Sequence, residues 1–151
     1  MRISTALRGR AVRKRGLVAA IADKCQKCGR EISIIVGQSW RHGLRWSMSC
    51  RCPFCGAAYE ADGRGIPPQD IRAAILSEQG QFELHVTDIA APTICIAKLL
   101  RKELSLSIPQ SSVLLRKMPG AVASGTRGEM EWLAHLVGEE CGYSAAVVKR
   151  A

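Results

Sequence analysis

The chain of 151 residues lacks the features that define several common protein classes. No apolar run approaches the roughly 20 residues that a helix needs to cross a bilayer. No phosphate-binding glycine-rich loop is present, because Gly63-Arg64-Gly65 is too short to cradle a phosphate. The histidines His42, His85 and His135 lie far apart in the sequence, and none stands beside a candidate nucleophile. We therefore predict that the chain is not an enzyme.

Cysteine, by contrast, recurs in two C-x-x-C-G motifs, Cys25-Gln26-Lys27-Cys28-Gly29 and Cys52-Pro53-Phe54-Cys55-Gly56. Zn²⁺ binds four soft ligands at the corners of a tetrahedron, and a C-x-x-C turn presents two thiolates to one side of the metal. The glycine lets the backbone fold tightly around them. Four thiolates close the coordination shell and leave no position for water, so the metal is expected to be structural. The predicted zinc ligands are Cys25, Cys28, Cys52 and Cys55.

Disulfide bonding and thiol redox catalysis are the alternatives to metal binding. The seven cysteines are an odd number and no convincing secretory signal precedes them, which favours a reducing cytoplasm and metal binding. A thioredoxin-type motif would open a helix in a βαβ unit, and the pattern here predicts no such unit. Cys50 is an alternative ligand to Cys52, although the position of Gly56 favours Cys52. Cys95 is expected to be an inert thiol in the core. Cys141, beside the end of a helix, is expected to be an exposed free thiol.

The residues between the two motifs predict a β-hairpin. Residues 31–36 are rich in β-branched side chains, residues 37–39 are expected to break the strand, and residues 44–51 alternate between apolar and polar. A hairpin would bring the two C-x-x-C turns together around one metal ion. We therefore predict a zinc ribbon over residues 23–62.

Most of the formal net charge of +9 lies at the start of the chain, since residues 1–22 contain six basic residues and no acidic one. This composition predicts a basic arm that touches RNA, and the alternative is a solvated, partly helical leader. Aromatic and basic residues also interleave in the hairpin, where they could stack on bases, unless a tryptophan only covers the metal site. The predicted nucleic-acid contacts are Arg8, Arg10, Arg13, Lys14, Arg15, Trp40, Arg41 and Arg45.

After the ribbon, Pro67-Pro68 and Gly80 enclose a helix that is predicted to form a linker over residues 63–80. From residue 81 onward the periodicity switches repeatedly between that of strands and that of helices. The pattern predicts an α+β domain over residues 81–151, with β-α-α-β-α-β order and its helices on one antiparallel sheet. Its elements are a strand at 81–86, helices from Pro92 and Pro109, a strand at 121–123, a helix capped by Thr126 and Glu129, and a strand at 144–149.

Residues 82–149 resemble the C-terminal domain of the bacterial ribosomal large-subunit stalk protein. The matching segment starts with Ile96-Ala97-Lys98-Leu99-Leu100-Arg101, continues with Leu104-Ser105-Leu106-Ser107-Ile108 and ends at Met118-Pro119. It is similar, without a gap, to that family's helix, Gly-Leu-Gly-Leu turn and Ala-Pro helix end. Ser105 and Ser107 replace the turn glycines, and Pro109 and Ser112 stand where the family has lysines. The family's dimerisation helices are missing, and the predicted zinc ribbon takes their place.

This resemblance implies a docking function, because the family recruits translational GTPases through a patch on the first two helices of the domain. Lys98 and Arg101 match basic contact positions, and Lys102 is expected to extend the patch. The chain is therefore expected to be a cytoplasmic zinc-binding docking protein of the ribosome or translation machinery, with no membrane partner and no small-molecule substrate.

Two alternative functions remain open at this point. One is a nucleic-acid-binding protein centred on the zinc ribbon. The other is an immunity or protease-adaptor protein that binds one specific protein, since the adaptor domain that presents substrates to Clp ATPases has a fold similar to the stalk domain. Fold resemblance alone does not choose the partner.

Overall fold

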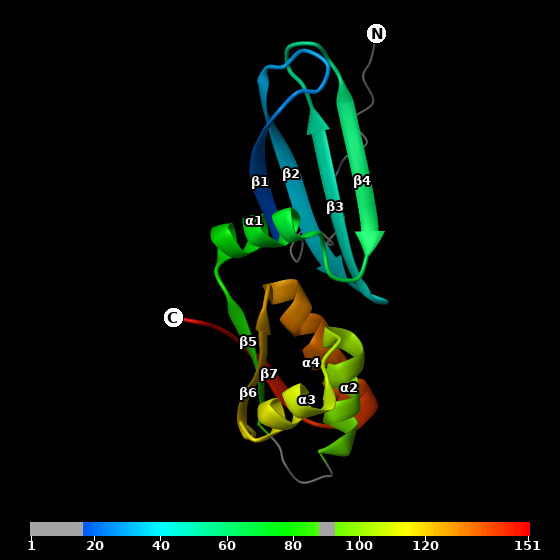
Figure 1. The fold of residues 1–151 in the computed structure, drawn as a ribbon, viewed down its shortest axis with the longest axis vertical. Helices are drawn as coiled ribbons and strands as arrows, with labels where there is room; N and C mark the ends of the chain where they lie inside the picture. The colour runs from blue at the N-terminus through cyan, green and yellow to red at the C-terminus, as the bar shows by residue number, and fades with distance from the viewer. Residues whose placement is uncertain (1–16, 88–92) are drawn as a thin grey trace, which may run out of the picture.

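The computed structural model describes residues 17–87 and 93–151. These residues form a mixed α+β molecule with two antiparallel sheets, one in each half of the chain (Figure 1). The first sheet occupies one end of the long axis, and the second sheet with helices α2, α3 and α4 occupies the other. In Figure 1, helix α1 lies near the middle, beside the part of the first sheet that is nearer the second half. The predicted α+β class is therefore confirmed.

The first sheet has four strands, each paired antiparallel with the next in chain order. Along β2 the side chains alternate as expected for a strand with one covered face, since Ile32 and Val36 are buried while Ser33 and Ile35 are exposed. β2 and β3 form the predicted hairpin between the cysteine motifs. The strands are β1 Leu17–Lys24, β2 Glu31–Trp40, β3 Leu44–Arg51 and β4 Ala58–Arg64.

Two details of the predicted ribbon were wrong. Residues 37–39 do not break the strand, because Gly37 and Gln38 pair with β1 on one side and with β3 on the other. Backbone hydrogen bonds to two neighbouring strands outweigh the low strand propensity of these residues. The predicted ribbon also included no strand after the second cysteine motif, but residues 58–64 pair with β3 as strand β4.

The predicted basic arm and linker also have different limits in the structure. Residues 17–22 belong to strand β1, where buried Ala19 faces the core of the first sheet. The last two residues of β4 lie inside the range predicted for the linker. The arginines and lysine predicted in residues 8–15 to bind nucleic acid lie outside the described residues.

Helix α1, Gln69–Gln79, packs on the first sheet rather than only linking the two halves. Its buried residues Ile71 and Ile75 form one cluster with Ala19 of β1 and Val36 of β2. The helix follows Pro68 and ends before Gly80, which has a positive φ of 82°. This packing gives the first sheet a hydrophobic core of its own.

The second sheet places β5 between its neighbours, in the order β6-β5-β7. Its helices lie against one another and against the sheet, and they enclose the larger core of the molecule, which includes Leu84, Leu100 and Leu133. The strands are β5 Phe82–Val86, β6 Gly120–Gly125 and β7 Ala145–Lys149, and the helices are α2 Ile94–Leu104, α3 Ile108–Leu115 and α4 Arg127–Cys141. Their order along the chain, β-α-α-β-α-β, is the predicted one.

The capping box predicted for the last helix is confirmed. The Thr126 side chain accepts a hydrogen bond from the backbone N–H of Glu129, and the Glu129 carboxylate accepts one from the backbone N–H of Thr126. The helix ends at Gly142, whose φ of 69° is readily adopted by glycine. The predicted start of α2 at Pro92 lies outside the described residues.

Helix α4 also joins the two halves of the molecule. Its Trp132 and His135 rings lie against Trp40 of β2, with ring centroids 5.9 and 5.2 Å from that of Trp40. The Thr126 hydroxyl, which precedes α4, donates a hydrogen bond to the buried Gln38 side chain. The N-terminal part of α4 and the far end of β2 therefore form one continuous contact.

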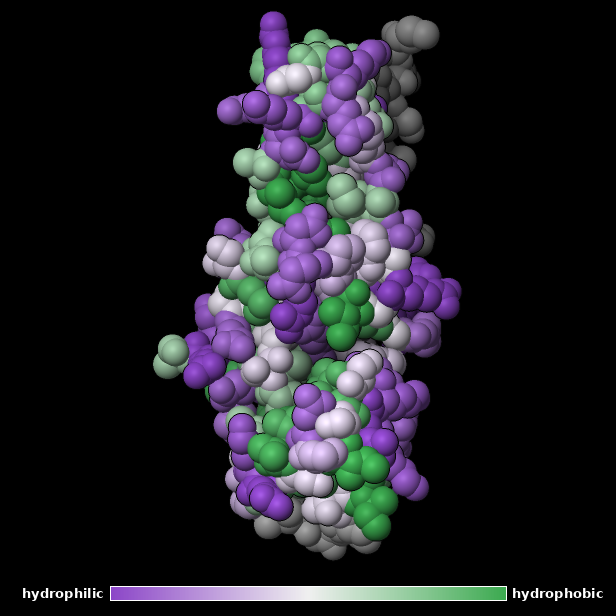
Figure 2. All heavy atoms as spheres, in the orientation of Figure 1, coloured by the Kyte–Doolittle hydropathy of each residue, from purple (hydrophilic) through white to green (hydrophobic). Residues whose placement is uncertain are grey.

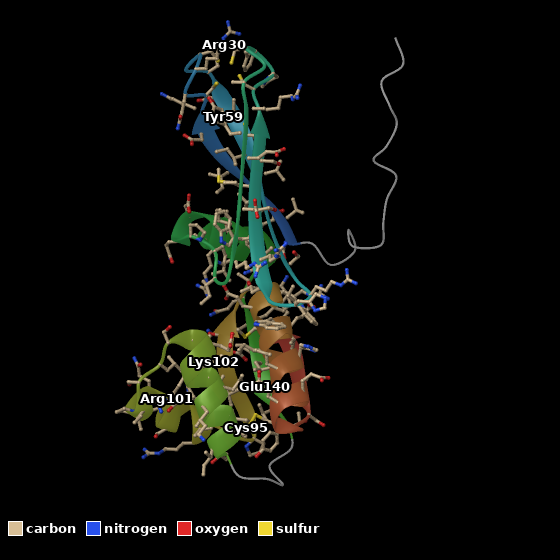
Figure 3. The ribbon with its side chains drawn as sticks, turned by 90° about the vertical axis from the view of Figure 1, so that its right-hand side faces the viewer. Arg30, Tyr59, Cys95, Arg101, Lys102 and Glu140 are labelled. Carbon is tan, nitrogen blue, oxygen red and sulfur yellow. A yellow bond between two sulfur atoms is a disulfide. The ribbon has the colours of Figure 1, made fainter. Side chains whose placement is uncertain are left out.

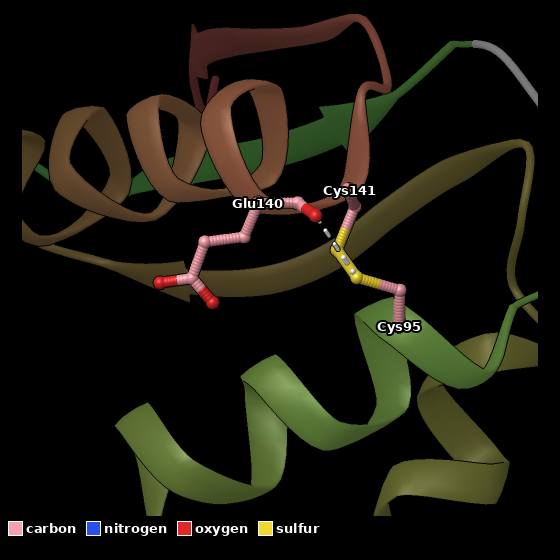
Figure 4. The surroundings of a disulfide bond; sticks show 3 residues. All are labelled: Cys95, Glu140 and Cys141. Atoms are coloured by element: carbon pink, nitrogen blue, oxygen red, sulfur yellow. Dashed lines mark hydrogen bonds between the residues drawn. A yellow bond between two sulfur atoms is a disulfide. The ribbon is translucent and has the colours of Figure 1, made fainter.

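The disulfide Cys95–Cys141 connects the start of α2 with the end of α4 (Figure 4). The sequence-based predictions for these two residues, an inert core thiol and an exposed free thiol, were wrong. The two positions are 46 residues apart, and only the packing of α2 on α4 brings their Cα atoms to 5.7 Å.

None of the helices in residues 17–87 and 93–151 combines the length and the apolar character that crossing a membrane requires.

Candidate metal centre

The two C-x-x-C-G motifs are turns at the same end of the first sheet, one between β1 and β2 and the other between β3 and β4. In each turn the backbone N–H of the glycine donates to the carbonyl of the first cysteine, Gly29 to Cys25 at 2.7 Å and Gly56 to Cys52 at 3.0 Å. Both glycines have positive φ, 72° and 74°. The two motifs therefore adopt the same local conformation, which presents their cysteines to a common point.

The four motif sulfurs, of Cys25, Cys28, Cys52 and Cys55, all lie within 4.8 Å of one another. Two distances join the motifs directly, 3.6 Å between the Cys25 and Cys55 sulfurs and 3.6 Å between the Cys28 and Cys52 sulfurs. A tetrahedral ion with metal–sulfur bonds of about 2.3 Å holds its ligands about 3.8 Å apart. The spacing and the donor type therefore fit a single bound metal ion.

Backbone N–H groups favour the thiolate form, which is the form that binds metals, at one cysteine of each motif. At Cys25, chiefly the N–H of Cys28 lowers the pKa to about 6. At Cys52, burial raises the pKa, but hydrogen bonds from the N–H groups of Cys55 and Phe54 and from the neighbouring thiols together outweigh it and lower the pKa. At Cys55, the N–H of Ala57 lowers the pKa, but burial and the neighbouring thiols outweigh it and raise the pKa to about 11.

Cys50, the alternative ligand, is not part of this group of sulfurs. It lies in β3, opposite Tyr59 of β4, and is 7% exposed. Burial is the main cause of its raised pKa, which favours the neutral thiol. The structure thus brings Cys52 rather than Cys50 to the candidate metal centre.

A small apolar cluster surrounds the cysteines. Ile32 and Cys50 are buried in it, and Tyr59 packs against it. Burial and the nearby Cys25 raise the pKa of Tyr59. Sequence reasoning expected a tryptophan in this role, but Trp46 belongs instead to the cluster around α1. The position of Tyr59 on the strand that leaves the second motif was the signal that could have identified it.

The turns around the candidate metal centre are strongly polar. Hydrophilic side chains project from this end of the molecule in Figure 2. The Arg30 guanidinium lies over the Phe54 ring, 4.6 Å from its centroid, and Phe54 is 56% exposed. We call this part of the molecule the knuckle surface and define it by its exposed cations, which are Lys24, Lys27, Arg30 and Arg51.

The predicted docking residues lie at the other end of the molecule. Lys98, Arg101 and Lys102 are exposed on α2, and Figure 3 shows Arg101 and Lys102 far from Arg30. Lys102 approaches the Glu103 carboxylate at 3.6 Å, whereas Lys98 and Arg101 form no ion pair within the described residues. The structure therefore brings the predicted docking residues together on one helix.

The hairpin residues predicted to contact nucleic acid have separate environments. The Trp40 indole N–H donates to the Glu131 carboxylate at 3.2 Å, and its ring packs on α4. Arg41 and Arg45 are exposed, and both line a cleft between the two halves of the molecule. Arg64 lines the same cleft and was missed by sequence reasoning, because its pairing opposite Arg45 depends on the unexpected strand β4.

The functions of these regions must be inferred from the chemistry of their residues, because no protein-family model, curated protein or solved structure matches this chain.

Proposed function

We propose that the chain is a non-enzymatic, zinc-binding docking protein that binds a protein partner of the translation machinery through α2 and α3. The exposed surface of these two helices carries the proposal. The identity of the partner rests on the resemblance of residues 82–149 to the ribosomal stalk domain. The metal is assigned a structural role, with Cys25, Cys28, Cys52 and Cys55 as its ligands.

Zn²⁺ is the metal that this ligand set favours. Four thiolates with tetrahedral spacing are typical of structural zinc sites, and such a shell leaves no position for water or substrate. When bound, the ion would hold the two C-x-x-C turns together and so fix the pairing of β1 with β2 and of β3 with β4. The sheet in turn carries α1 and the contact with α4.

The α2–α3 surface combines cations with exposed large apolar side chains. Ile94 and Ile108 are each 63% exposed and Val113 is 53% exposed. Apolar side chains gather over this part of the molecule in Figure 2. Exposed apolar groups bordered by charged ones are typical of protein interaction sites. The residues that define the α2–α3 surface are Ile94, Lys98, Arg101, Lys102, Ile108 and Val113.

The proposal is tested with the double substitution Lys98→Glu and Arg101→Glu, measured by co-sedimentation of the full chain with bacterial ribosomes and translational GTPases. We expect the affinity for the partner to fall at least about tenfold, because two negative charges would repel a partner surface that binds cations. Circular dichroism and zinc content should not change, since both residues are exposed on a helix.

The matched control is Lys24→Glu with Arg51→Glu, which makes the same charge change on the knuckle surface. This control should retain binding. Equal binding by the wild-type chain and by the α2 double variant would contradict the docking proposal.

A nucleic-acid-binding function is the second candidate, and the knuckle surface favours it. Its cations and the exposed Phe54 ring are a combination that contacts phosphates and stacks on bases. Binding of this kind weakens steeply as the salt concentration rises, because phosphate contacts release counterions. A steep salt dependence that disappears in the Lys24→Glu, Arg51→Glu control would favour this second function over the first.

A further inference from the structure

A cleft of about 630 Å³ lies between the two halves of the molecule. Three arginines line its first-sheet side, and apolar side chains of α2 and α4 line the other. This volume is within the range of roughly 300–1,000 Å³ that is typical of small-molecule sites. We call it the arginine cleft and define it by Arg41, Arg45, Arg64, Leu104, Trp132 and Leu133.

The three arginines give the first-sheet side of the cleft a positive charge. Arg45 and Arg64 face each other directly in the β3–β4 register, where like charges are unfavourable. Arg41 follows β2 in the turn between β2 and β3. All three are exposed, and none forms an ion pair within residues 17–87 and 93–151.

The two carboxylates that also line the cleft are already occupied. Glu129 binds both the Nε and the Nη2 of Arg72, at 2.8 and 2.9 Å. Glu103 lies 3.6 Å from the Lys102 ammonium. Because these acids are paired with other cations, an anion from outside is the natural partner for the three arginines.

The interior of the cleft is suited to an apolar group. Leu44 and Leu133 are buried, and Trp132 is half-buried against the core of the second half. Ile66, which also lines the cleft, is 51% exposed although it is a large apolar side chain. A ligand with an apolar body would remove this side chain and the Trp132 ring from water.

We propose that the arginine cleft binds a small amphipathic anion, which has a compact apolar body and a single carboxylate or phosphate group. The apolar body lies against Trp132 and Ile66, and the anionic group lies between Arg45 and Arg64. Binding relieves the repulsion between the two arginines. This site is separate from both the metal centre and the α2–α3 surface.

The proposal is tested by isothermal titration calorimetry, which measures the affinity of the full, zinc-loaded chain for three probes of similar shape. These are 2-naphthylacetate, 2-naphthyl phosphate and the uncharged 2-naphthaleneethanol. We expect at least one anion to bind at least about tenfold more tightly than the alcohol, because charge-assisted hydrogen bonds to arginine add to the apolar contact. The tighter of the two anions identifies the natural head group as carboxylate or phosphate.

Two variants assign the binding to this cleft. The double variant Arg45→Gln, Arg64→Gln should bind the anion at least about tenfold more weakly. This variant should fold normally, since it removes a repulsive pair. Ile66→Asp, at an exposed position, should also abolish binding because it introduces a negative charge where the apolar body lies. The matched control, Arg116→Gln with Lys117→Gln, loses the same charge at exposed positions after α3 and should bind as the wild type does.

The proposal would be overturned if neither anion binds at millimolar concentration or if the alcohol binds as tightly as the anions. It would also be overturned if anion affinity falls equally in the control and in the Arg45→Gln, Arg64→Gln variant, because the effect would then reflect net charge alone.

Discussion

At the residue scale, the ion pair between Arg72 and Glu129 connects the two halves of the molecule. The Glu129 side chain is 6% exposed, and it accepts two hydrogen bonds from Arg72 of α1 and one from the backbone N–H of Thr126. Glu129 in turn raises the pKa of Arg72 through these hydrogen bonds. A buried carboxylate with this many donors stabilises the fold, provided that all of its partners stay in place.

Substitution Glu129→Gln should therefore lower the free energy of unfolding by about 2 kcal/mol, less than the full cost of breaking a buried pair because Arg72 is partly exposed. Urea denaturation followed by circular dichroism measures the change. Glu131→Gln is the control on the same helix, where the carboxylate is 22% exposed and a loss below about 1 kcal/mol is expected. Equal losses in the two variants would contradict the role assigned to Glu129.

The local backbone geometry could be predicted from the sequence where one short motif determines it. The C-x-x-C-G turns and the Thr126–Glu129 capping box are examples, since each depends on residues within about one turn of chain. The contact between Trp40 and Glu131 was not predicted, because it joins residues 91 positions apart. No local pattern specifies which distant helix a hairpin end will meet.

At the element scale, strand β1 illustrates why some segments were misjudged. Residues 17–22 are small and apolar and resemble the end of a leader segment, but pairing along β2 makes them a strand. The same holds for β4, whose residues Asp62 and Gly63 have low strand propensity and yet pair with β3. Propensity is a weak guide wherever a neighbouring strand supplies the hydrogen bonds.

The Cys95–Cys141 disulfide is a second feature of this scale, because it fixes α2 to α4. Closing a loop of 46 residues reduces the entropy of the unfolded chain and contributes up to about 4 kcal/mol. The double substitution Cys95→Ser with Cys141→Ser should lower the free energy of unfolding by a large part of this amount in an oxidising buffer, measured by urea denaturation.

Reduced wild-type chain provides the control for this disulfide. A phosphine reductant should lower the stability of the wild type to that of the double variant and leave the variant itself unchanged. The assigned role of the bond would be refuted by a variant that is as stable as the oxidised wild type.

At the scale of the whole molecule, contacts of α4 hold the two halves together. The first half contains the candidate metal centre, and the α2–α3 surface lies at the opposite end of the second (Figure 3). Between them, Trp40, Trp132 and His135 form one aromatic contact. The order of elements in the second half could be predicted from periodicity, but this arrangement of the two halves could not, because it depends on contacts between distant residues.

The measurement that tests the account most directly is the zinc content of the purified chain, determined by mass spectrometry of the metal. We predict about one Zn²⁺ per chain in the wild type and in Cys50→Ser, and well under half of that in Cys55→Ser, since Cys55 belongs to the group of four sulfurs and Cys50 does not. A wild-type chain with less than half an equivalent of zinc, or a Cys50→Ser variant that loses as much zinc as Cys55→Ser, would contradict the account.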